Sequence, residues 1–209
     1  MIISTLSERE KLDKVVDIIH RLPLDGLALK YEKALSNRRV PDKAVLGVHT
    51  YNIEGTKVYV VCTKQLFGQG KRAMGELLFS YYLETICPYT GKRRYIRPSF
   101  DYYGLRVISY MEFTSHFVKR LKERAGLDFI DIVTMQGAVP IIGDIADKDG
   151  ETIMKWGDYT LFGYRGELVT YITTMVTPEM LRQEQIEKGI EFDDVLKDFI
   201  DKRNIAIRA

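Results

Sequence analysis

Three apolar segments near the end of the chain are joined by short turns that contain glycine. β-Branched and aromatic residues dominate these segments, which favours strands over helices. Connections of two or three residues are too short to carry the chain over a sheet to a parallel neighbour, so consecutive segments must pair in opposite directions. The pattern therefore predicts a three-strand antiparallel meander at Thr152–Trp156, Tyr159–Tyr164 and Leu168–Val176.

Further strands are predicted earlier in the chain. Apolar and polar residues alternate over Val45–Asn52, Glu54-Gly55 supplies a turn, and Thr56–Cys62 returns as the second arm of a hairpin. Gly104–Glu112 is a strand that leads directly into a helix. The apolar and aromatic segment Leu77–Ile86 fits either a strand or a short helix, and its periodicity does not separate the two.

Helices are predicted on both sides of this β-rich region. Ser7 and Glu10 form a capping box that begins a helix ending near Arg21, a second helix begins at Asp25, and Pro178 opens a last helical region. The expected fold class is α+β, in which hairpins and the meander form an antiparallel sheet packed by N-terminal, central and C-terminal helices. We expect one compact unit with a helical hairpin (1–43), an α+β core module (44–177) and a C-terminal helical region (178–209).

The charge balance limits the classes of function. With 31 Lys and Arg against 29 Asp and Glu, the net charge of +2 excludes a uniformly polycationic nucleic-acid binder, so phosphate binding would need local clusters. Cys62 and Cys87 lack the spacing of a zinc site or a disulfide framework, and we expect reduced thiols and no metal. No apolar segment approaches the roughly 20 residues of a membrane helix. We expect a cytoplasmic protein, or one held in an intracellular or virion assembly.

The segment Phe113–Gly126 carries the best functional lead. At helical spacing its apolar residues form one stripe, and an imidazole, two guanidiniums and a carboxylate form the neighbouring face, from His116, Arg120, Glu123 and Arg124. A neutral histidine exchanges protons near neutral pH, and guanidiniums hold phosphates and stabilise their developing charge. These groups suffice for metal-independent RNA cleavage by the 2′-hydroxyl, which requires no cofactor.

A second cluster of cations precedes this helix. The turn at Pro88–Gly91 is followed by basic residues interleaved with aromatic ones, a composition that single-stranded nucleic acids use for backbone and base contacts. A charged hairpin with ordinary tyrosine pairs explains the same pattern. The candidate nucleic-acid-binding residues are Lys92, Arg93, Arg94, Arg97 and, on the central helix, Lys119.

The region of about residues 112–176 resembles domains of the barnase, EndoU, colicin and RelE-like ribonuclease superfamily. The likeness lies in Phe113-Thr114-Ser115-His116-x-x-x-Arg120-x-x-Glu123-Arg124, the two short helices, and the final strand Val169–Thr174. The resemblance implies helices packed on a curved antiparallel sheet, and members act as ribonuclease toxins or as non-enzymatic derivatives. It implies His116 as acid and base, Arg120 and Arg124 on the phosphate, and Tyr171 or Thr173 assisting. The long region before Glu112 departs from the compact members.

Two other functions fit the same residues. In the first, the chain is a non-enzymatic interaction or structural protein, encoded by a phage or mobile element, and its terminal helices bind a partner or a second copy. In that case the His116 face is a ladder of solvated ion pairs. A weaker alternative is a metallohydrolase that uses His49 and His116 together with carboxylates.

Overall fold

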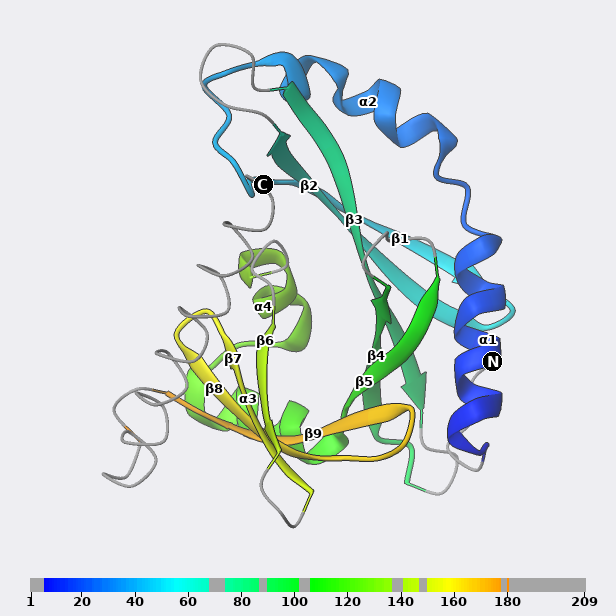
Figure 1. Cartoon of the computed structure of the whole chain (residues 1–209), viewed down its shortest axis with the longest axis vertical. Coiled ribbons are helices and arrows are strands. Elements are labelled where there is room, and N and C mark those ends of the chain that lie inside the picture. Colours follow the sequence, from blue (N-terminus) through cyan, green and yellow to red (C-terminus); the bar gives the residue numbers. More distant parts are fainter. Residues whose placement is uncertain are drawn as a thin grey trace, which may run out of the picture.

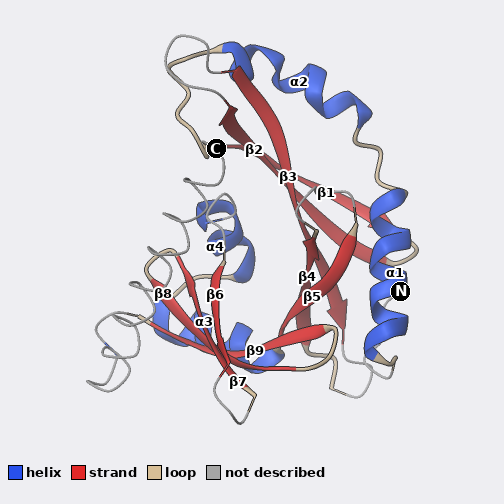
Figure 2. Ribbon diagram, viewed as in Figure 1, coloured by secondary structure: helices blue, strands red, loops and turns tan. Residues whose placement is uncertain are grey.

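The computed structural model describes residues 6–67, 74–86, 90–101, 106–136, 141–146, 150–177 and 180. Within these residues, four helices pack on one nine-stranded sheet (Figures 1 and 2), which confirms the predicted α+β class. The helices are α1 (Glu8–His20), α2 (Asp25–Ser36), α3 (Ser115–Ala125) and α4 (Phe129–Gln136). The strands are β1 (Val45–Ile53), β2 (Thr56–Phe67), β3 (Met74–Ile86), β4 (Arg93–Phe100), β5 (Val107–Phe113), β6 (Ile142–Ala146), β7 (Glu151–Trp156), β8 (Tyr159–Arg165) and β9 (Val169–Val176).

The sheet order is β1-β2-β3-β4-β5-β9-β8-β7-β6, and its neighbours are antiparallel except at one seam. There β5 pairs in parallel with β9, with Tyr110 opposite Val169 and Phe113 opposite Ile172. A parallel pair needs a long crossover, and here the chain between the two strands contains α3, α4 and the rest of the meander. The predicted hairpin β1–β2 and meander β7–β9 are both present, while β6 was not predicted.

The ambiguous segment Leu77–Ile86 is part of strand β3. It pairs with β2 along most of its length, from Met74 opposite Phe67 to Glu84 opposite Lys57. Its pairing with β4 is shorter and covers Leu83–Ile86 alone. The segment forms a strand because its backbone pairs with that of β2; if it were a helix, the backbone groups along this edge of β2 would lack hydrogen bonds.

Two hydrophobic cores lie on opposite faces of the sheet. The outer core joins α1 and α2 to the sheet, and the inner core lies under α3 and α4, within the curve that brings β7 and β8 round (Figure 1). Residues of the outer core include Leu12, Val15, Ile18, Leu27, Val58, Val60, Leu83, Ile96, Tyr110 and Val169. Residues of the inner core include Val61, Tyr82, Tyr95, Phe113, Phe117, Leu121, Phe129, Trp156, Ile172 and Met175.

The burial of both faces explains the unbroken apolar run in β2. Val58, Val60 and Cys62 face the outer core, and Tyr59 and Val61 between them face the inner core. Strands covered on both sides lose the alternation of apolar and polar residues that marks a half-exposed strand. The central strands therefore need helices on each face, and α1 with α2 and α3 with α4 supply them.

The first two helices cover different parts of the outer face. The capping box of α1 is confirmed, because Glu10 N donates to Ser7 Oγ at 3.3 Å and Ser7 N donates to Glu10 Oε2 at 2.8 Å. α1 packs beside β5, whereas α2 packs beside β3 at the other end of the molecule (Figure 1). Of the C-terminal helical region predicted at 178–209, all but residue 180 lies outside the described residues. Among the helices that the structure describes, none is long and apolar enough to cross a membrane.

Candidate nucleic-acid interface

Helix α3 begins and ends where its sequence predicts. Thr114 Oγ1 accepts a hydrogen bond from Phe117 N at 3.3 Å, and Gly126 closes the helix with a φ of 68°. Phe117 and Leu121 are completely buried in the inner core. The opposite side of the helix, with His116 and Lys119, therefore faces solvent.

The exposed side of α3 and the start of β4 line one hollow of about 580 Å³. Two segments that the sequence singled out independently for nucleic-acid binding thus lie side by side. Four permanently charged cations and one imidazole face two carboxylates there. The cationic and imidazole groups belong to Lys92, Arg93, His116, Lys119 and Lys122, and the carboxylates to Glu123 and Asp128.

Most of these cations already have an acidic neighbour. Arg93 Nε lies 3.4 Å from Glu84 Oε1, Lys119 Nζ lies 3.5 Å from Glu123 Oε1, and Lys122 Nζ lies 3.1 Å from Asp128 Oδ1. The pairs of Lys119 and Lys122 are exposed at both partners and contribute at most about 1 kcal/mol each, whereas the Glu84 side chain beside Arg93 is only 9% exposed. Among the described residues, no carboxylate lies within ion-pair distance of Lys92. An incoming phosphate can therefore replace the acidic partners of Lys119 and Lys122 at low cost, and Lys92 is available to it directly.

His116 and Arg120 are coupled along the helix. Arg120 Nε donates to His116 Nε2 at 3.4 Å, and Arg120 Nη1 donates to Glu123 Oε2 at 2.9 Å. Because Nε2 accepts in this arrangement, the neutral ring carries its proton on Nδ1. The lone pair of Nε2 is therefore engaged by a guanidinium, and His116 has to release this hydrogen bond before Nε2 can accept a proton from a substrate.

The other predicted catalytic residues lie elsewhere. Arg124 Nη1 donates to the Met175 carbonyl and so ties α3 to β9. Tyr171 packs against the outer core and stacks on Tyr164 with ring centroids 4.7 Å apart, on the opposite face of the sheet from α3. Burial, together with the carboxylates of Glu112 and Glu8, raises the pKa of Tyr171 to about 12.

The Thr173 side chain hydrogen-bonds to the backbone of the neighbouring strand β8. Ile172 pairs with Gly163 and Thr174 pairs with Phe162, so Thr173 is the extra residue of a β-bulge, and its hydroxyl donates to the Phe162 carbonyl at 3.1 Å. A Cβ at Gly163 would lie 1.9 Å from the Tyr171 carbonyl oxygen, so the bulge requires glycine there. The structure brings Lys92, Arg93, Lys119 and His116 together, and it does not bring Arg124, Tyr171 or Thr173 to them.

Strand β4 divides the basic segment between the two faces. Arg94 Nη1 donates to Glu112 Oε1 at 2.8 Å, and Lys11 Nζ donates to the other oxygen of this carboxylate at 3.1 Å, with the Glu112 side chain only 2% exposed. Arg97 lies over the ring of Tyr82 at 5.8 Å. Arg94 thus holds α1, β4 and β5 together, whereas Lys92 and Arg93 remain at the hollow. Lys122 lines the hollow without having been predicted, although its position one turn after Lys119 is a signal that identifies it.

His49 lies on the outer face, across the sheet from His116. Its Nε2 atom is 2.8 Å from the Tyr31 hydroxyl, and burial, followed by the charge of Lys30, lowers the pKa of His49. The two histidines therefore do not share a metal site. Within the described residues, no group of three or more His, Cys, Asp or Glu side chains is placed to hold a metal ion.

Comparison of the chain with protein-family models, curated proteins and solved structures gives no match. The likeness to the ribonuclease superfamily therefore remains a prediction based on the α3 motif and the β9 strand.

Proposed function

We propose that this chain is an RNA-directed module that binds the phosphate backbone of single-stranded RNA in the hollow between α3 and the start of β4. The observation that carries the proposal is the convergence of four cations and His116, from two separate segments, on one hollow. Phosphate contacts supply most of the affinity of sequence-independent binding, because each neutralised phosphate releases condensed counterions. The weakly held side chains of this hollow suit that role.

Within this proposal, the module is a metal-independent ribonuclease. The 2′-oxygen of the RNA bonds to phosphorus while the P–O5′ bond breaks, which leaves a 2′,3′-cyclic phosphate and a 5′-hydroxyl. In this step the Arg120 guanidinium turns from His116 Nε2 to the phosphate, whose charge it stabilises, and the freed Nε2 takes the proton of the 2′-hydroxyl while water returns a proton to the leaving oxygen. Arg124 and Tyr171 have no part in this version of the site, because their side chains are engaged elsewhere.

Binding is tested by fluorescence anisotropy with a labelled RNA of about 12 nucleotides, the length of one single-strand site. We expect the double substitution Lys92→Glu/Lys119→Glu to weaken binding at least about tenfold and to lower the salt slope of log K by about 0.7 for each phosphate that is no longer neutralised. Lys14→Glu is the matched control, because Lys14 is an exposed lysine of α1 on the outer face. Equal affinity of the double variant and the control would remove the proposal.

Cleavage is tested with the same RNA in the presence of a metal chelator. The wild-type protein is expected to release a product with a 2′,3′-cyclic phosphate, and His116→Ala is expected to bind RNA but to cleave no bond. RNA with 2′-O-methyl groups should bind and remain intact, since its nucleophile is blocked. Binding of RNA and of the matched single-stranded DNA with no cleavage of either by the wild type would limit the module to phosphate binding.

An open sheet edge favours a second candidate, a protein-interaction module. Within the described residues, β3 lacks a strand partner on its β4 side from Met74 to Phe79. Met74 and Leu78 in this part of β3 are 71% and 47% exposed. An unpaired edge with exposed apolar side chains is a template for strand addition. Light scattering after size exclusion is expected to show dimers of the wild type and monomers of Leu78→Lys; a monomeric wild type would exclude pairing of two copies.

A further inference from the structure

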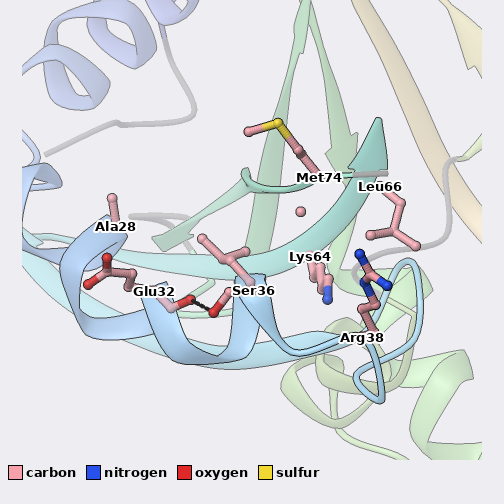
Figure 3. Close-up of a pocket in the computed structure, with 9 residues that line it drawn as sticks. Ala28, Glu32, Ser36, Arg38, Lys64, Leu66 and Met74 are labelled. Carbon is pink, nitrogen blue, oxygen red and sulfur yellow. Dashed lines mark hydrogen bonds between the residues drawn. The ribbon is translucent and has the colours of Figure 1, made fainter. Parts of the chain in front are cut away.

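A second hollow, of about 560 Å³, lies between the last turns of α2, the end of β2 and the start of β3 (Figure 3). In Figure 1, α2 is at the opposite end of the molecule from α3. Three apolar side chains form much of its wall, those of Leu35, Leu66 and Met74, and Lys64 and Arg38 add two cations. Leu66 and Met74 are 37% and 71% exposed, so a large apolar surface is open to solvent here.

Lys64 is built into the wall of this hollow. Only 1% of the residue is exposed, and its ammonium donates to the Asn37 carbonyl at 2.7 Å and to the Ala34 carbonyl at 3.3 Å, at the end of α2. Its aliphatic stem passes over Gly75, where a Cβ would lie 2.7 Å from Lys64 Cε and 2.4 Å from the Leu35 carbonyl oxygen. Any side chain at position 75 would collide with the Lys64 stem, so this arrangement requires glycine there.

The charge of this buried ammonium is incompletely balanced. The carbonyl end of a helix offers roughly half an elementary negative charge. Within the part of the chain that the structure describes, no carboxylate lies within 4.0 Å of Lys64 Nζ to supply the rest. Buried cations are normally paired with an anion. Glu32 also lines the hollow, but Figure 3 shows it away from the end where Lys64 and Arg38 lie.

We propose that this hollow binds an amphiphilic carboxylate with an aliphatic chain of fatty-acid type. The carboxylate lies at the end formed by Lys64 and Arg38, where it completes the charge balance of the buried ammonium. The aliphatic chain covers Leu35, Leu66 and Met74, whose surface is otherwise exposed. The volume of the hollow falls in the range of about 300–1,000 Å³ that is usual for small-molecule sites.

The proposal is tested by calorimetric titration of the full chain with decanoate, decanol and acetate. Decanoate is expected to bind at least about tenfold more tightly than either of the others, because decanol lacks the charge and acetate lacks the chain. In ¹⁵N–¹H spectra, decanoate is expected to shift the signals of Ser36, Arg38 and Gly75, which line the hollow. Equal binding of decanol would reduce the hollow to an apolar surface, and shifts confined to other regions or no binding of decanoate would overturn the proposal.

Variants at the mouth of the hollow separate the site from the stability of α2. Arg38→Glu is expected to weaken decanoate about tenfold, and Arg39→Glu, one residue away and outside the lining, is expected to leave it unchanged. Met74→Glu places a charge beside the aliphatic chain and should weaken binding without touching Lys64. Thermal melting shows that each variant is folded. Unchanged affinity of both Arg38→Glu and Met74→Glu would refute the assignment of the site.

Discussion

Glu112→Gln should lower the free energy of unfolding far more than a surface substitution does, because it removes the anion shared by two cations. The Glu112 side chain is 2% exposed, and Lys11 and Arg94 are 7% and 29% exposed at their side chains. Arg94 can reach water when it loses this partner, so its share of the cost is small. Lys11 cannot, and removing one partner of a buried pair typically costs about 3–5 kcal/mol. We expect a total loss of about 4 kcal/mol from these two contributions.

Urea unfolding followed by circular dichroism measures this loss as a shift of the midpoint at constant slope. Lys11→Met is the companion variant, because it leaves Glu112 paired with Arg94 and should cost only about 1–2 kcal/mol. The double variant Glu112→Gln/Lys11→Met no longer strands a buried ammonium, so it should be more stable than Glu112→Gln alone. A loss below about 1 kcal/mol for Glu112→Gln, or a double variant less stable than the single one, would refute the reasoning.

Four other predictions each concern a single position. Folding lowers the pKa of His49, so the neutral ring contributes its full share to the stability of the fold above about pH 6.5, the ordinary pKa of histidine. Thermal midpoints should therefore fall as the pH falls from there through the lower pKa of the folded state. His49→Phe should make the midpoint less dependent on pH in this range. Gly163→Ala should lower the free energy of unfolding in urea by more than about 2 kcal/mol, because the added Cβ meets the backbone of β9. Gly26→Ala in α2 has open space around its Cβ and should raise the free energy of unfolding by up to about 1 kcal/mol. Thr114→Ala should cost about 1 kcal/mol of unfolding free energy because it removes the cap of α3, and an unchanged urea midpoint would contradict this.

The elements that the sequence predicts well are those encoded by neighbouring residues. The meander follows from its short turns, and α3 follows from its cap, its apolar stripe and its final glycine. Strand β3 was ambiguous because its faces are both apolar, and only the pairing with β2 decides it. The parallel contact of β5 with β9 joins residues far apart in the chain, and no local pattern contains that information.

The candidate site shows the same division. Helical spacing predicts one shared face for His116, Arg120, Glu123 and Arg124; hydrogen bonds couple the first three, while Arg124 donates to the Met175 carbonyl. Arg94 has the same residue type and neighbourhood as Arg93, yet strand alternation directs it to Glu112 on the other face. Tyr171 is separated from α3 for the same reason, because the face to which a strand residue points depends on register. The type of a charged residue indicates what it can bind, and only tertiary partners show whether it is available.

The seam between β5 and β9 has a consequence for the order of assembly during synthesis. Besides the pairing itself, α1 reaches across the seam, because Glu8 Oε2 accepts from Leu168 N at 2.9 Å while Lys11 binds Glu112 in β5. Helix α1, near the start of the chain, thus makes one of its contacts with a residue about 160 positions later in the sequence. The two halves of the sheet cannot join through β5 and β9 until residue 172 has left the ribosome, so this contact forms after most of the chain has been translated.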